Sequence, residues 1–89
     1  MTSDNFINLC KQIIVHYYID NTELKPCYND VQVVWQCKTL QNYKAILMVK
    51  IADQRIFECS FNGDKEELYL DVYNKEYNHK YEYGKLYNK

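Results

Sequence analysis

Three apolar runs between residues 31 and 61 alternate hydrophobic and polar side chains with a period of two. In a β-strand, this period places every second side chain on the same face of the sheet. One face receives Val31, Val33, Trp35 and Cys37 from the first run, Tyr43, Ala45, Leu47, Val49 and Ile51 from the second, and Phe57, Cys59 and Phe61 from the third. Short polar breaks at residues 40–42 and 52–54 separate the runs. The pattern predicts a three-stranded antiparallel meander with one face turned to the core.

Residues 4–20 have the period of an amphipathic helix instead. Apolar side chains recur there at spacings of three and four, at Phe6, Leu9, Cys10, Ile13 and Tyr17. Ser3 is the predicted N-cap, and Asp4 suits the positive end of the helix dipole. We expect this helix to lie across the apolar face of the meander.

Residues 62–77 allow two interpretations. The Asn62-Gly63 pair favours a hairpin that leads into a fourth strand with Leu68, Leu70 and Val72 on one side. Alternatively, Asp64 and Glu67 form a capping-box-like pair that starts a second helix. Its apolar stripe would consist of Leu68, Tyr69, Val72, Tyr73 and Tyr77. The segment is long for a strand, so we favour the helix and an α+β fold with the order α-β-β-β-α, and keep the fourth strand as the alternative.

The length of 89 residues predicts one domain, which we place at residues 1–78. A tail rich in Tyr and Lys follows at residues 79–89. No apolar run approaches the roughly 20 residues that a membrane-spanning helix needs. The N-terminus also lacks the basic start of a secretory signal. We therefore expect no membrane association and a cytosolic protein, with its four cysteines reduced because no Cys-x-x-Cys pair is present.

The chain offers little that resembles an active site. His16 and His79 have no partner at the spacing of a metal site or a catalytic triad. The sequence places no base near its cysteines, and it has no glycine-rich phosphate loop. We expect no enzymatic activity and no cofactor or metal.

Two surfaces are instead candidates for partner binding. The side of the meander away from the helix should carry an apolar patch, and exposed patches of this kind usually mark contact surfaces. Its members are Val34, Ile46, Met48 and Ile56. A second, acidic surface should lie in residues 62–77, with Asp64, Glu66, Glu67 and Asp71. The tyrosine-rich tail could equally fold over the apolar patch, and this alternative stays open.

Two strings in the chain are distinctive. The first is VWQCKTLQN at residues 34–42, with Lys44-Ala45 after it, and the second is NGDK at residues 62–65, leading to ELYLD at residues 67–71 and Tyr73. With these strings the chain resembles a family of small uncharacterised proteins from phages and prophages of low-GC Gram-positive bacteria. The likeness covers residues 4–75. It implies no catalytic residues, but it does imply a context, because small phage proteins often act stoichiometrically on a host protein, including defence nucleases.

We therefore expect a binding protein that inhibits or modulates a host protein. Acidic surfaces can occupy the nucleic-acid groove of a nuclease by charge complementarity. One alternative is a weak single-strand nucleic-acid binder that uses the tail with Lys38, Lys44, Lys50 and Arg55. Nucleic acid is the less favoured partner because the net charge is −1 and no basic stripe is present. A homodimeric structural component is the third interpretation.

Overall fold

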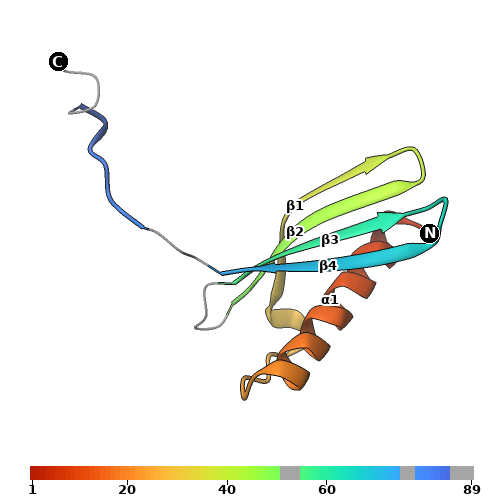
Figure 1. Ribbon diagram of the computed structural model, residues 1–89, viewed down its shortest axis with the longest axis horizontal. Helices are drawn as coiled ribbons and strands as arrows, with labels where there is room; N and C mark the ends of the chain where they lie inside the picture. The colour runs from red at the N-terminus through yellow and green to blue at the C-terminus, as the bar shows by residue number, and fades with distance from the viewer. Residues whose placement is uncertain (51–54, 75–77, 85–89) are drawn as a thin grey trace.

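The computed structural model describes residues 1–50, 55–74 and 78–84. One helix, α1 (Ser3–Asn21), is followed by a short 3-10 turn, η1 (Tyr28–Asp30), and by the strands β1 (Val31–Thr39), β2 (Asn42–Val49), β3 (Ile56–Asn62) and β4 (Glu67–Tyr73). All neighbouring strands pair antiparallel, in the order β1-β2-β3-β4. The α+β class is confirmed, and the architecture has two layers, with α1 against one face of the sheet (Figure 1).

The helix α1 begins where a side chain can satisfy its first free backbone groups. Thr2 is the N-cap, and its Oγ1 accepts a hydrogen bond from the backbone N–H of Asn5 at 3.1 Å. The cap therefore lies one residue before the predicted Ser3. Four residues of the helix are buried, at every fourth position: Phe6, Cys10, Ile14 and Tyr18. Positions four apart advance by about 40° around an α-helix, so the buried line winds around α1, and Leu9 is left 37% exposed.

The core lies between α1 and the central strands. The alternation predicted for β2 is confirmed in the described residues, because Tyr43, Ala45, Leu47 and Val49 are buried. Phe57 and Cys59 of β3 are buried as well, and Phe61 is half-buried. The Phe57 ring packs at 5.5 Å from the Tyr18 ring and at 5.6 Å from the Tyr17 ring, which ties β3 to α1. The predicted core residue Ile51 and the break at 52–54 lie outside the described residues.

A β-bulge in β1 overturns part of the predicted register. Val33 pairs with Leu47, but the next pair along the strands is Trp35 with Ile46, so Val34 is an extra residue. An extra residue shifts the alternation by one, and everything beyond it changes face. Val31 is buried as predicted, whereas Trp35 and Cys37 lie exposed on the side of the sheet away from α1. The prediction that Trp35 and Cys37 face the core is wrong for this reason.

The predicted second helix is wrong as well, and the alternative of a fourth strand is correct. Residues 67–73 form β4, which pairs with β3 from Asn62–Glu67 to Ile56–Tyr73. The Asn62 side chain accepts hydrogen bonds from the backbone N–H groups of Asp64 and Lys65, at 3.0 and 3.2 Å. In this Asx-type turn the side-chain acceptor is Asn62, two residues before the Asp64 that a helical N-cap would have used, and the chain turns back into a strand. Tyr77, the last residue of the predicted helical stripe, lies outside the described residues.

The two hairpin turns at one end of the sheet support each other. The Gln41 side chain donates to the Asp64 carboxylate, and the Asn42 side chain accepts from the Gly63 backbone N–H at 3.0 Å. A Cβ on Gly63 would lie 2.2 Å from the Gln41 carbonyl oxygen, so only glycine allows this approach. Leu40 in the first turn and Glu66 in the second have positive φ, at 56° and 52°. These turns hold β1–β2 beside β3–β4 at their tips.

The described part of the tail, residues 79–84, is exposed. Figure 1 shows it leading away from the sheet, and Tyr81 and Tyr83 are 60% and 76% exposed. In this structure these residues do not cover the side of the sheet opposite α1. Residues 75–77 and 85–89 lie outside the described part of the chain.

Candidate functional site

The face of the sheet away from α1, here called the open face, carries the candidate site. The strand register arranges its side chains in rows that cross the sheet. These rows are Gln32–Met48–Ile56–Tyr73, Trp35–Ile46–Glu58–Asp71 and Cys37–Lys44–Ser60–Tyr69. Side chains directly opposite each other on neighbouring strands lie about 4.5–5.5 Å apart at Cβ. The open face is therefore one continuous surface contributed by all four strands.

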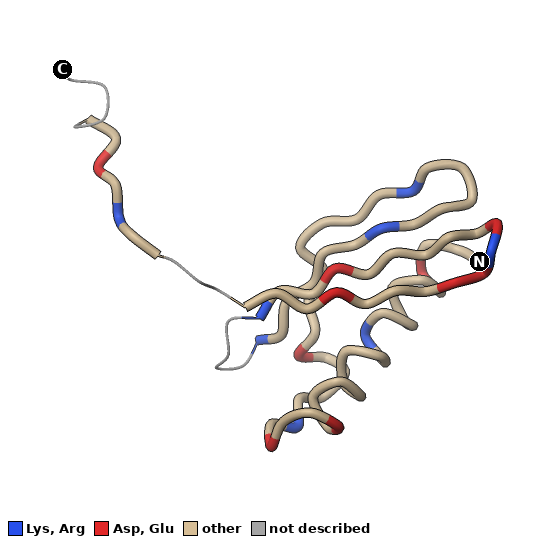
Figure 2. Tube along the Cα trace, viewed as in Figure 1, with Lys and Arg blue, Asp and Glu red and all other residues tan. Residues whose placement is uncertain are grey.

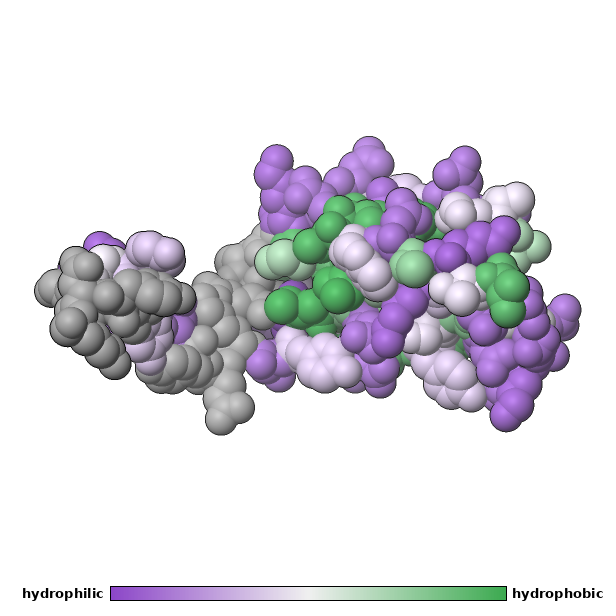
Figure 3. All heavy atoms as spheres, turned by 90° about the horizontal axis from the view of Figure 1, so that it is seen from above, coloured by the Kyte–Doolittle hydropathy of each residue, from purple (hydrophilic) through white to green (hydrophobic). Residues whose placement is uncertain are grey.

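One half of the open face is apolar. The exposed fractions are 48% for Trp35, 42% for Met48, 41% for Ile56 and 51% for Tyr73, and Ile46 between them is half-buried. Val34, at the bulge beside them, is 59% exposed. Figure 3 shows several neighbouring groups of hydrophobic residues on one face, with pale and hydrophilic residues between and around them. The structure thus brings together the predicted residues Val34, Ile46, Met48 and Ile56.

Trp35 and Tyr73 belong to the same apolar area and were missed by the sequence reasoning. The alternation assigned Trp35 to the core, and the expected second helix removed Tyr73 from the sheet. For Trp35 the sequence carried no signal, because a bulge adds one residue without changing the composition of the strand. The Asn62-Gly63 hairpin pair was the signal that could have placed Tyr73.

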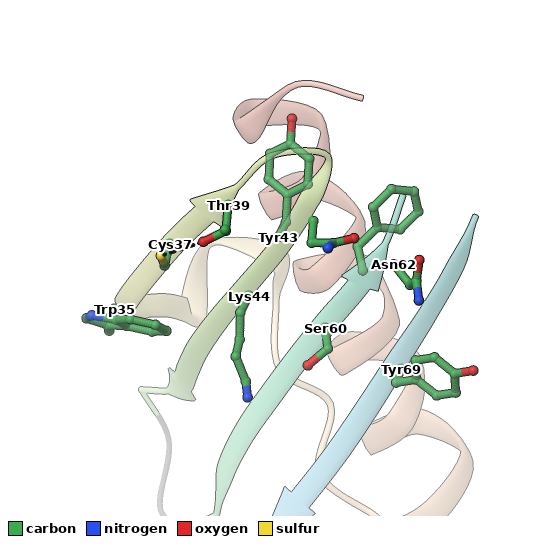
Figure 4. A pocket seen from close by; sticks show the side chains of 10 residues that line it. Trp35, Cys37, Thr39, Tyr43, Lys44, Ser60, Asn62 and Tyr69 are labelled. Carbon is green, nitrogen blue, oxygen red and sulfur yellow. Dashed lines mark hydrogen bonds between the residues drawn. The ribbon is translucent and has the colours of Figure 1, made fainter. Parts of the chain in front are cut away.

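The other half of the open face holds a shallow hollow of about 450 Å³ whose lining mixes aromatic and polar side chains. Figure 4 shows Trp35, Cys37, Lys44, Ser60 and Tyr69 along it, from all four strands. The Cys37 Sγ lies 3.9 Å from the Thr39 Oγ1. The residues that line the hollow include neither a histidine nor a carboxylate that could serve as a base. The hollow presents a thiol, Cys37, and a lysine, Lys44, among its lining residues.

The charges on the open face sum to a negative value. Lys44 Nζ lies 3.3 Å from a carboxylate oxygen of Glu58, and Asp71 sits directly opposite Glu58 on β4. Like charges in opposed positions destabilise a sheet pair, so one lysine beside two carboxylates leaves an acidic row. Figure 2 shows the acidic residues of β3 and β4 side by side.

The predicted acidic surface is split between two places. Asp71 and Glu67 lie on the open face, in β4, whereas Asp64 and Glu66 lie at the tip of the β3–β4 hairpin with Lys65 between them. Glu67 also acts on its neighbour, because its hydrogen bond with the Tyr69 hydroxyl and its negative charge raise the pKa of Tyr69. Of the predicted acidic set, only Asp71 therefore adjoins the apolar area, because Glu67 lies at the opposite end of β4.

The cysteines divide into a buried pair and two exposed residues. Cys10 of α1 and Cys59 of β3 are in contact in the core, and Cys27 and Cys37 are exposed. The hydrogen bond with Cys59 and the burial of the site both raise the pKa of Cys10, so its thiol stays protonated. Among residues 1–50, 55–74 and 78–84, no three His, Cys, Asp or Glu side chains come together as a metal site.

No helix within the described residues has the length and apolar character needed to cross a membrane. In comparisons with known proteins, the model of a family described as "Family of unknown function (DUF6275)" matches residues 7–83. No curated protein and no solved structure matches the chain.

Proposed function

Since this chain belongs to the DUF6275 family, described as a family of unknown function, we propose from its surface chemistry that it is a small, non-catalytic protein-binding protein. The open face is its contact surface. The single observation that supports this most is the exposed apolar area across four strands, which the chain itself leaves uncovered in the described residues. Monomeric proteins rarely leave large apolar patches without a binding role.

The residue types on the open face are those that bind proteins best. Trp, Tyr and Met are enriched at the centres of protein interfaces, and Trp and Tyr often dominate their binding energy. Trp35 and Tyr73 stand at opposite edges of the apolar area, on β1 and β4, with Ile46, Met48 and Ile56 between them. We assign Trp35 and Tyr73 as the anchors and the aliphatic residues as the surface that excludes water.

The acidic row specifies the chemistry of the partner. A partner with an apolar area flanked by lysine or arginine would relieve the opposition between Glu58 and Asp71 and gain charge-assisted hydrogen bonds. Grooves that bind nucleic acid combine these features. This supports, as our proposal, a stoichiometric inhibitor or modulator of a host protein such as a defence nuclease, acting in the host cytosol in the phage context that the sequence resemblance implies.

Single-stranded nucleic acid is disfavoured by the position of the cations. Lys38 and Arg55 lie over tyrosine rings, Lys38 at 5.4 Å from Tyr43 and Arg55 at 5.5 Å from Tyr17. On the open face itself, Lys44 is engaged by Glu58. Stacking of bases on Trp35 and the tyrosines would therefore lack the positive surface that tracks a phosphate backbone.

The test uses two matched isoleucines. Ile56 on the open face and Ile19 on α1 are 41% and 51% exposed, so Ile56→Asp and Ile19→Asp introduce the same charge at similar exposure. The tagged wild type is used to capture host proteins, and each captured protein is then purified and titrated calorimetrically against the three forms. We expect Ile56→Asp to weaken binding at least tenfold and Ile19→Asp to leave it within about twofold.

Equal binding by the wild type and Ile56→Asp would contradict the proposal. So would tight binding of a mixed-sequence single-stranded oligonucleotide that weakens steeply between 50 and 200 mM salt, which is the signature of phosphate contacts. Circular dichroism of both variants checks that the fold is retained.

A further inference from the structure

The outer strand β4 has an unprotected edge. The structure describes no strand beside it, and β4 contains no proline, no bulge and no lysine. These are three of the devices by which proteins block the edges of sheets; a fourth, charged side chains, is present on β4 as Glu67 and Asp71 and restricts the registers that a pairing strand can take. The opposite outer strand, β1, does carry a bulge, at Val34. Only one of the two edges is therefore protected by an irregularity.

The helix-facing side chains of β4 are also incompletely covered. The helix α1 packs mainly on β1, β2 and β3. As a result the core residues come from α1 and those three strands, whereas Leu68, Leu70 and Val72 of β4 are only half-buried. A further strand beside β4, with its own apolar side chains on the helix side, would increase the burial of these three side chains.

The sequence of β4 is complementary to itself in one antiparallel register. If Leu70 lies on a two-fold axis, Leu70 meets Leu70 of the second copy, and Leu68 meets Val72, all on the helix side. On the open face, Tyr69 meets Asp71 and Glu67 meets Tyr73, which pairs each carboxylate with a hydroxyl donor. Shifting the axis to Tyr69 would set Glu67 against Asp71, and shifting it to Asp71 would set two aspartates together. These are the unfavourable cross-strand pairs.

We propose that a second copy of this chain pairs with the first along β4, antiparallel, with the two-fold axis at Leu70. The product is one eight-stranded sheet with both α1 helices on the same side and both open faces on the other. The contact uses the strand edge and the half-buried leucine and valine side chains. It therefore goes beyond the proposed partner binding and does not depend on it.

The first experiment measures association with charge variants at Tyr69. Light scattering with size-exclusion chromatography should give twice the chain mass of 10.8 kDa at high concentration and a lower mass on dilution. In the proposed register, Tyr69→Lys places a cation opposite Asp71 twice per dimer, and Tyr69→Glu places an anion there. We expect Tyr69→Lys to strengthen and Tyr69→Glu to weaken dimerisation, each by about twofold to thirtyfold. The matched controls are Tyr81→Lys and Tyr81→Glu in the exposed tail, which should change nothing.

The second experiment fixes the register by cross-linking, in a chain that carries Cys27→Ser, Cys37→Ser and Cys59→Ala. Cys59 is replaced because it lies directly opposite Leu70 on β3 and would compete for a cysteine introduced there. Residues opposite each other in an antiparallel pair have Cα atoms about 4.5 or 5.5 Å apart, within reach of a disulfide. Leu70→Cys should therefore form a covalent dimer under mild oxidation. Val72→Cys alone should not, because its copy lies about 13 Å away along the strand, whereas a mixture of Leu68→Cys and Val72→Cys chains should cross-link only between the two kinds.

If light scattering gives the mass of a single chain for the wild type at all concentrations, the proposal is overturned. A dimer that responds equally to both Tyr69 variants, or one that cross-links through Val72→Cys alone, would also overturn it. Because these readouts involve no partner protein, they stand or fall separately from the Ile56→Asp titration.

Discussion

Replacing Trp35 by alanine should destabilise the protein much less than replacing Phe57, although alternation along the chain assigns both to the core. Phe57 is fully buried and its ring contacts the rings of Tyr17 and Tyr18. Trp35 lies beyond the bulge, on the open face, and is 48% exposed. The comparison therefore tests whether the extra residue Val34 turns the second half of β1 so that Trp35 faces away from the core.

The size of each effect follows from burial. Removing a fully buried Phe leaves a cavity and costs about 3–5 kcal/mol. A buried aromatic side chain removes about 150–250 Å² from water, so a half-exposed Trp35 buries about 100 Å², worth at most about 2.5 kcal/mol. The unfolded chain already buries part of this area, and truncation of a side chain on an open surface leaves no cavity. We expect Trp35→Ala to cost about 1–2 kcal/mol.

Urea unfolding followed by far-UV circular dichroism, at one low protein concentration for all forms, gives the two values. The whole domain should be stable by about 4–13 kcal/mol at this length, so complete unfolding of Phe57→Ala without urea agrees with the expectation. Trp35 is the only tryptophan, and acrylamide should quench its fluorescence readily in the folded state. A Trp35→Ala loss equal to that of Phe57→Ala, together with protected fluorescence, would refute the bulge and restore the plain alternation.

Two further predictions concern titratable side chains. Because Cys10 and Cys59 are buried and Cys27 and Cys37 are exposed, a thiol reagent should modify two cysteines in the native protein and four after unfolding; four fast thiols in the native state would contradict the packing of α1 on β3. The Glu67 carboxylate raises the pKa of the Tyr69 hydroxyl, so Glu67→Gln should move the Tyr69 titration to lower pH. Ring-resonance NMR against pH follows this midpoint, and an unchanged or higher value would exclude the contact.

Alternation predicted most of the sheet because β2 and β3 are central strands. Their side chains face α1 on one side only, so burial imposes a strict period of two on residues such as Ala45, Leu47 and Cys59. The outer strand β1 has a neighbour on one side, and a bulge there breaks fewer ladder bonds. That is why the register was predictable in the middle of the sheet and failed at its edge, between Val33 and Trp35.

The second helix was predicted wrongly because β4 satisfies both periods at once. Leu68 and Val72 lie four residues apart, as on a helix face, and Leu68, Leu70 and Val72 also alternate, as in a strand. Whether residues 67–73 form a helix or a strand depends on tertiary context. The free edge of β3 offers backbone N–H and C=O groups, and β4 forms hydrogen bonds with them. The candidate site inherited both errors: its aliphatic residues followed from the central strands, whereas Trp35 and Tyr73 required the bulge and the fourth strand.

The two proposed surfaces reinforce each other through β4. On its open side, β4 contributes Tyr73 to the apolar area, with Asp71 beside it, and the same strand carries the free edge. Pairing of two β4 strands would therefore place Tyr73 of each copy near the centre of a joint open face rather than at its margin. Anchor residues bind more strongly when surrounding contacts exclude water from them. Dimerisation would thus both complete the burial of Leu68, Leu70 and Val72 and shield an anchor for the partner protein. The incomplete burial of β4 in the single chain would then be explained by the second copy that covers it.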